Sequence, residues 1–205
     1  MSDDVVFKSE GLLMARKRLE NGSDFKPLTM AELHQIESGL EGDRHEFRNK
    51  ALLNLCIWSG LRISEICGLK ISDVYDTKSI RAHLEIKTFG RVECGTRRVI
   101  LSKQTVRFLL PYVHRRLESG ALPDSPLFFA SRTPEKNITP NVAWSIVRNS
   151  LEKANISNLS VTSLRRTFAK SMLDRGADIQ RVQRQMGYKS LTVTGMSLEK
   201  ALKKK

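Results

Sequence analysis

Two predicted helices meet in the sequence Ser59-Gly-Leu-Arg-Ile-Ser-Glu-Ile66. Apolar residues recur at helical spacing over 47–58, and Gly60 can end that helix because glycine readily adopts the left-handed backbone conformation. A second, short helix is predicted over 63–67. Arg62 therefore stands at the start of a helix, where free backbone N–H groups and a guanidinium together favour an anion.

The flanking pattern predicts a mostly α domain with a small antiparallel β-sheet (α+β). Extended segments are expected over 69–74, 82–87 and 97–101, and they would form this sheet. Thr29 and Glu32 have the spacing of a capping box, which predicts the start of the first helix of the domain. Helices are expected, in order, over 29–39, 102–118, 139–153, 163–175 and 178–187.

The chain has 205 residues and a formal charge of +13. Hydrophobic residues make up 40% of it, yet no apolar run approaches the roughly 20 residues of a membrane span, so a disordered basic protein and a transmembrane protein are excluded. We expect an arm or linker over 1–26 and one folded domain over 27–205. The acidic start and three cysteines without CxxC spacing predict a cytoplasmic protein with reduced thiols.

The positive charge gathers on two segments, which favours a polyanion as partner. One segment is the C-terminal quarter of the chain, from residue 160 onward, and the other is the predicted hairpin around Lys87. Aromatic residues make up only 6% of the chain, so binding to a duplex backbone is favoured over stacking on a single strand. An anionic membrane surface or an ordinary solvated surface is the alternative explanation of the charge.

Two further motifs place basic residues at defined positions. The sequence Leu84-Glu-Ile-Lys87-Thr-Phe-Gly90 puts a lysine near the tip of the hairpin. The sequence Val161-Thr-Ser-Leu-Arg-Arg-Thr-Phe-Ala169 puts Arg165 and Arg166 in the first turns of a helix. Each motif alone is also compatible with ordinary surface residues.

Taken together and in this order, the motifs resemble the catalytic domain of the tyrosine recombinases, the phage integrase family. The resemblance covers about residues 27–200. The family motif G-L-R-x-x-E-(I/L)-x-x-L is matched over 60–69, and L-R-(R/H)-T-F-A is matched over 164–169. The motif L-G-H-x-S is approached by Met186-Gly-Tyr-Lys-Ser190.

The resemblance implies chemistry on DNA without a metal or another cofactor. In the family a tyrosine hydroxyl attacks a phosphodiester, two arginines hold the nonbridging oxygens and a lysine protonates the leaving oxygen. Arg62 and Arg165 would be that arginine pair and Lys87 the general acid. Glu65 would support the pocket. Flanking contacts to double-stranded DNA are expected from Arg91, Arg97, Arg98, Arg166, Lys189 and Thr162.

The chain departs from the family pattern at three positions. Thr162 and Tyr188 replace the two histidines, and Ser197 occupies the usual place of the attacking tyrosine. Four alternatives stay open: strand cleavage is lost, Tyr188 attacks from a displaced position, Ser197 attacks, or another protein supplies the tyrosine. For Tyr188, donating a hydrogen bond to phosphate in place of the histidine is favoured over nucleophilic attack.

Family members usually carry an N-terminal helical domain that closes around DNA, whereas only about 26 residues precede the domain here. We therefore expect an oligomer on DNA or an accessory partner protein, and no membrane partner. Shortened family members are known as mobilisation proteins of mobile elements, MpsA-type proteins among them. The leading hypothesis is a DNA-binding protein in recombination, integration or conjugative mobilisation. The alternatives are an active recombinase or atypical relaxase, and a transcription or maintenance factor on the same fold.

Overall fold

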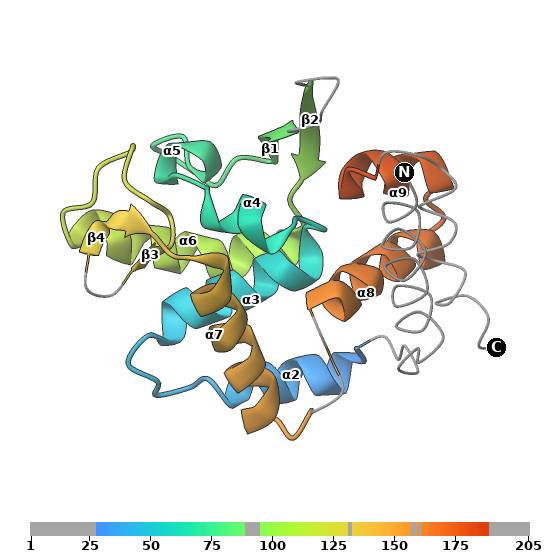
Figure 1. The fold of residues 1–205 in the computed structure, drawn as a ribbon, viewed down its shortest axis with the longest axis horizontal. Coiled ribbons are helices and arrows are strands. Elements are labelled where there is room, and N and C mark those ends of the chain that lie inside the picture. Colours follow the sequence, from blue (N-terminus) through green and yellow to red (C-terminus); the bar gives the residue numbers. More distant parts are fainter. Residues whose placement is uncertain (1–27, 89–94, 131–132, 157–158, 160, 189–205) are drawn as a thin grey trace, which may run out of the picture.

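The computed structural model describes residues 28–88, 95–130, 133–156, 159 and 161–188, and it confirms a mostly helical fold with small antiparallel sheets (Figure 1). The expected arm over 1–26 lies outside the described residues. No helix in the described part is both long and apolar enough to cross a bilayer. The elements are α2 (Met30–Ser38), α3 (Glu46–Trp58), α4 (Ile63–Cys67), α5 (Ile71–Val74), β1 (His83–Thr88), β2 (Gly95–Ile100), α6 (Lys103–Glu118), β3 (Phe129–Ala130), β4 (Thr133–Asn137), α7 (Pro140–Lys153), α8 (Val161–Asp174) and α9 (Ile179–Met186).

Helix α3 lies at the centre of the main core. Every side chain over 51–58 is buried, because α6, α7 and α8 all pack against this helix. The second half of α6 is joined to the segment before β3 by Tyr112, whose hydroxyl donates to the Leu127 carbonyl at 2.7 Å and whose ring stacks on that of Phe128 with centroids 5.4 Å apart. Helix α3 therefore gives a rigid base to the turn that follows it, which carries Arg62.

Several helix ends confirm the predicted caps. The Thr29 hydroxyl accepts from the Glu32 backbone N–H at 3.2 Å, and the Glu32 carboxylate accepts from the Thr29 N–H at 2.8 Å. Helix α7 begins after Thr139, with Pro140 in its first turn. Helix α9 ends at Gly187, whose φ of 65° is the left-handed conformation that favours glycine.

The prediction of an extended segment over 69–74 is wrong, because the short helix α5 forms there. The Asp73 carboxylate accepts the backbone N–H of Lys70 at 2.8 Å and so caps the start of this helix. Ile71 and Val74 are both buried, which a helix allows because residues three apart lie on one face.

The described strands form two separate two-stranded antiparallel sheets, whereas one sheet was expected. The β1–β2 hairpin is the predicted one, with Lys87 opposite Thr96. The β3–β4 hairpin was not predicted, because β4 has the polar sequence Thr-Pro-Glu-Lys-Asn and its side chains are largely exposed. Alternating apolar residues, the usual sign of a strand, are therefore missing from it.

Helices α8 and α9 enclose a second, smaller apolar cluster that includes Phe168, Val182 and Met186. Gly60, with a φ of 69°, lets the chain after α3 approach this cluster closely. A Cβ atom on Gly60 would lie 2.7 Å from Met186 Sδ and 2.7 Å from Phe168 Cδ1. The α8–α9 pair therefore packs directly on the turn between α3 and α4 (Figure 1).

Candidate functional site

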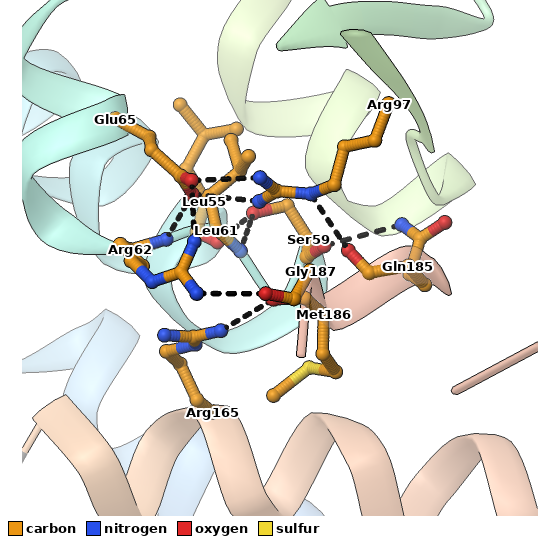
Figure 2. A network of polar contacts seen from close by, with 10 residues as sticks. All are labelled: Leu55, Ser59, Leu61, Arg62, Glu65, Arg97, Arg165, Gln185, Met186 and Gly187. Atoms are coloured by element: carbon orange, nitrogen blue, oxygen red, sulfur yellow. Dashed lines mark hydrogen bonds and ion pairs between the residues drawn. The ribbon is translucent and has the colours of Figure 1, made fainter. Parts of the chain in front are cut away.

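Arginines from three different elements meet at the C-terminal end of α9 (Figure 2). Arg62, which precedes α4, donates through Nη2 to the Gly187 carbonyl at 2.7 Å. Arg165 of α8 donates through Nη2 to the Met186 carbonyl at 2.7 Å. These carbonyls lie at a helix end, where the last C=O groups lack partners within the helix and the dipole favours cations. The two guanidiniums are thus brought together by adjacent backbone carbonyls. We call Arg62 and Arg165 the arginine pair.

Glu65 neutralises part of this charge from the next turn. Its carboxylate accepts from Arg62 Nη1 at 2.9 Å and from the Arg62 backbone N–H at 2.7 Å. It also accepts two parallel bonds from Arg97, each 2.7 Å long, in the bidentate geometry that suits guanidinium and carboxylate. Burial raises the pKa of Glu65, but the hydrogen bonds from Arg97 and Arg62 outweigh it, and the pKa is lowered overall.

Arg97 and Arg98 are neighbours on β2 with different surroundings. The Arg97 side chain is only 9% exposed, and it donates to Glu65 and, at 3.4 Å, to the Gln185 carbonyl. Arg98 is exposed and lies 2.8 Å from Nδ1 of His83. The structure therefore places Arg97, expected as a flanking DNA contact, inside the site as the partner of Glu65.

Arg62 and Arg165 differ in exposure. The side chain of Arg62 is 42% exposed, so it remains accessible from solvent although it has two partners. Arg165 is more deeply placed, and burial lowers its pKa, although an arginine stays protonated in proteins. Its Nε has no hydrogen-bond partner within the described residues. Its guanidinium carbon lies 5.5 Å from the centroid of the Tyr188 ring, which places that ring beside the arginine pair.

The structure does not bring every expected residue to this point. Lys87 is exposed on β1, and none of the described polar contacts that join Arg62, Glu65, Arg97 and Arg165 to their partners involves it. Arg166 follows Arg165 on α8 and is partly buried. Arg91, Lys189 and Ser197 lie outside the described residues, as does the side chain of Thr162.

Gln185 is a site residue that the sequence analysis did not identify. It is 5% exposed, and its amide nitrogen donates to the Ser59 carbonyl at 3.2 Å and to the Ile100 carbonyl at 3.0 Å. Its amide oxygen accepts from the Ile100 backbone N–H at 3.1 Å. Gln185 thus ties α9 to β2 and to the end of α3. In the sequence, the one signal that could have identified Gln185 is its position next to the apolar residue Met186, which is buried.

The site as a whole carries three arginines and one carboxylate, which leaves a net positive charge facing solvent through Arg62. Guanidinium groups with free N–H edges are suited to bind phosphate oxygens in pairs. Across the described part of the chain, no group of three or more His, Cys, Asp and Glu side chains is arranged to hold a metal ion. The arrangement can therefore bind and polarise an anionic oxygen-rich group.

Similarity to known proteins covers most of the chain. Residues 26–201 match the phage integrase family. The chain is 33% identical over 195 residues to the tyrosine recombinase XerA of Pyrococcus horikoshii, covering 92% of this chain and 63% of that protein. It is 31% identical over 160 residues to the tyrosine recombinase XerC of Pelobacter propionicus, covering 78% of this chain and 50% of that protein.

Solved structures of recombinases also match most of this chain. The crystal structure of XerA recombinase has a TM-score of 0.70 and 26% identity, covering 84% of this chain and 60% of that chain. The XerH recombinase bound to a palindromic difH substrate, in a post-cleavage complex, has a TM-score of 0.66 over 86% of this chain and 50% of that chain. At 19% identity the XerH likeness is one of fold alone. The chain thus spans about half to two thirds of the length of the proteins it matches.

Proposed function

Because the chain belongs to the phage integrase family, we propose that it binds double-stranded DNA in the recombination, integration or conjugative mobilisation of a mobile element. Relatives of the same fold were solved with DNA, namely XerH with its difH substrate and the Tn1549 integrase with transposon right end DNA. The net charge of +13 supports a polyanionic partner.

The observation that carries the proposal is the convergence of Arg62 and Arg165 on the end of α9. Their acceptors, the Gly187 and Met186 carbonyls, are consecutive in the chain and each lies 2.7 Å from a guanidinium nitrogen. Each guanidinium keeps further N–H groups that can donate to the nonbridging oxygens of one phosphate. Glu65 positions Arg62 for this contact.

The surrounding residues take supporting roles in this proposal. Tyr188, beside Arg165 at 5.5 Å, donates its hydroxyl to the phosphate where family members have a histidine. Lys87 and Arg98, both exposed on the β1–β2 hairpin, contact the flanking backbone. Further phosphate contacts are expected, from the sequence, at Arg91, Arg166, Lys189 and Thr162.

Equilibrium binding to a fluorescent duplex over a range of salt concentrations tests the proposal. Arg62→Gln and Arg165→Gln should each weaken binding about tenfold at low salt and reduce the salt slope by about one counterion, because each removes a phosphate contact. Arg148→Gln is the matched control, since Arg148 is an exposed α7 arginine that is paired with Glu152. Its affinity should stay within about twofold of wild type.

Thermal unfolding of each variant separates a lost contact from a lost fold, because it checks that the domain remains folded. Arg62→Lys keeps the charge but not the planar fork, so it should keep the salt slope and lose part of the affinity. Unchanged affinity in both Arg62→Gln and Arg165→Gln would contradict the proposal and favour a factor that uses the fold without this site.

Strand cleavage with Tyr188 as nucleophile is the second candidate function. It is favoured by the position of the Tyr188 ring 5.5 Å from the Arg165 guanidinium. The phenol would lose its proton as its oxygen bonds to phosphorus, and the 5′ oxygen would take up one proton as its bond to phosphorus breaks. The products are a 3′-phosphotyrosine and a free 5′ hydroxyl, with no net change in protons. Our proposal gives Tyr188 the binding role instead, with strand cleavage absent or dependent on a tyrosine from another protein.

A covalent trapping assay separates the two functions. Nicked duplexes from the DNA flanking the gene are incubated with protein, and adducts that survive denaturing electrophoresis are counted. Adducts that form with wild type and Tyr75→Phe, but not with Tyr188→Phe, would establish cleavage by Tyr188. The matched control is suitable because Tyr75 is a tyrosine whose hydroxyl bonds to the Thr77 carbonyl. We expect wild type alone to form no adduct.

A further inference from the structure

A cavity of about 280 Å³ opens at the opposite end of α3 from the arginine pair, between the start of α3 and the end of α6. Helix α3 has 13 residues, which corresponds to about 20 Å along its axis, so the cavity is separate from the site at α9. Four arginines line the cavity, and this concentration of cations is unexplained by the proposed function. They are Arg44, Arg48, Arg115 and Arg116.

Two of these guanidiniums lie over aromatic rings at cation–π distance. The guanidinium carbon of Arg115 lies 3.7 Å from the centroid of the Phe47 ring, and that of Arg116 lies 4.3 Å from the centroid of the Phe129 ring. A cation–π contact uses the face of the ring and none of the guanidinium N–H groups, so those not otherwise engaged can still donate. The cavity therefore offers fixed hydrogen-bond donors rather than an open aromatic surface.

Arg116 is the most informative of the four. Its side chain is buried, with 8% of the residue exposed, and its Nη2 donates to the Pro126 carbonyl at 3.0 Å. Its Nε has no partner in the described part of the chain, and neither Arg115 nor Arg116 forms an ion pair with a described carboxylate. A buried cation without a counter-charge is unfavourable, so an anion in the cavity would stabilise it.

The two carboxylates that line the cavity are engaged by lysines. Asp43 accepts from Lys153 at 2.6 Å, and Glu46 accepts from Lys50 at 2.8 Å. Glu46 also accepts the Gly42 backbone N–H at 3.0 Å, and the hydrogen bond from Lys50 is the main reason that its pKa is lowered, with a smaller contribution from the charge of Arg115. These carboxylates therefore do not cancel the positive charge of the four arginines.

The start of α3 adds to the positive potential. His45, the residue before α3, makes no capping hydrogen bond with its side chain, and of the first N–H groups of the helix that of Glu46 donates to the Asp43 carbonyl at 2.9 Å. Burial lowers the pKa of His45, and the charges of Arg48 and Arg44 lower it further. The helix start and the arginines thus favour an anion at the same place.

We propose that this cavity binds the phosphoryl group of a small molecule, either free phosphate or a small phosphate ester. The planar N–H edges of the arginines suit the oxygens of a dianion. The volume of about 280 Å³ is just below the roughly 300–1,000 Å³ of common small-molecule sites, which limits the ligand to a small body. The depth of Arg116 requires a group that can enter the cavity, which a small phosphate does more readily than a duplex backbone.

The test measures binding to the whole chain by NMR and calorimetry, with inorganic phosphate and glycerol 3-phosphate as the two probes and sodium chloride of equal ionic strength as the reference. We expect saturable shifts at the amides of Arg44, His45, Ser119 and Phe129 with at least one probe. Tighter binding of glycerol 3-phosphate would assign the site to an ester, and equal or tighter binding of inorganic phosphate would assign it to the free anion.

Arg115→Gln should weaken this binding about tenfold, because it removes one charged donor from an exposed position without disturbing the core. Arg107→Gln is the control, since Arg107 is exposed on the same helix and also lies over a phenylalanine ring, at 5.5 Å from Phe108. It should leave the affinity unchanged. The proposal is overturned if neither probe binds saturably, if both variants weaken binding equally, or if only duplex DNA shifts the cavity amides.

Discussion

The guanidinium of Arg62 and the carbonyl of Gly187 are 2.7 Å apart although 125 positions separate them in the sequence. This bond joins the start of α4 to the end of α9, so the backbone directly before Tyr188 is held beside Arg62. Glu65 holds the other side of the same guanidinium at 2.9 Å. The geometry of the site therefore depends on the packing of α8 and α9 as much as on the arginines themselves.

Replacing Glu65 by glutamine should destabilise the domain by about 3 kcal/mol, because it leaves the buried guanidinium of Arg97 without its counter-charge. Urea unfolding measures the change. Glu152→Gln is the control, since the Arg148–Glu152 pair is more than half exposed on both sides and should contribute no more than about 0.5 kcal/mol. Equal losses of stability in the two variants would mean that the Glu65 network stabilises the domain no more than an exposed ion pair does.

The same carboxylate predicts a pH dependence. The pKa of Glu65 is lowered in the folded protein relative to its ordinary value of 4.5. Its contribution to stability is therefore complete above the unfolded pKa and is lost as the pH falls through the folded pKa. The difference in unfolding free energy between wild type and Glu65→Gln should be constant above about pH 6 and shrink below about pH 4.5. A difference that grows on acidification would contradict this assignment.

Gly60→Ala should loosen the attachment of α8 and α9. The substitution combines the strain of a positive φ, 69°, with a Cβ atom 2.7 Å from Met186 Sδ and from Phe168 Cδ1. Gly176→Ala isolates the strain, because Gly176 has a φ of 84° and no neighbour within 4 Å of the added atom. Gly60→Ala should cost at least about 1 kcal/mol more than this control in thermal unfolding. Equal costs would show that α8 and α9 can shift freely.

Gln185→Leu should destabilise the domain by about 2 kcal/mol, because it leaves the Ser59 and Ile100 backbone groups without their partner. Gln180→Leu, an exposed position at the start of α9, is the matched control and should change stability by less than about 0.5 kcal/mol. Hydrogen exchange offers a local readout, since the Ile100 amide should lose protection only in the Gln185 variant. Retained protection would mean that the amide has another acceptor.

The helix starts that the sequence predicted correctly depend on local signals. The caps at Thr29 and Asp178 depend on neighbours three positions away, so the sequence alone was enough to predict the helix starts. The gathering of Arg62 and Arg165 followed from the family resemblance, since nothing local could relate positions that far apart.

The residues that were misplaced depend on tertiary contacts. Arg97 on an alternating strand was expected to face DNA, and its partner Glu65, 32 positions earlier, could be found only from the packed structure. Helix α5 begins with the cap formed by Lys70 and Asp73. In the sequence, this capping pair was a weaker signal than the surrounding apolar residues, which favoured an extended segment. The exposed strand β4 carries no periodic pattern from which pairing with β3 could be predicted.

The central claim is that Arg62 and Arg165 hold the same phosphate, and a double-mutant cycle tests it most directly. Duplex affinity is measured at one salt concentration for wild type, Arg62→Gln, Arg165→Gln and the double variant, all checked for folding. Because each side chain needs the other to position the phosphate, the double variant should lose at least about 1 kcal/mol less than the sum of the two single losses. Losses that add within about 0.3 kcal/mol would contradict a shared phosphate and assign the two arginines to separate contacts.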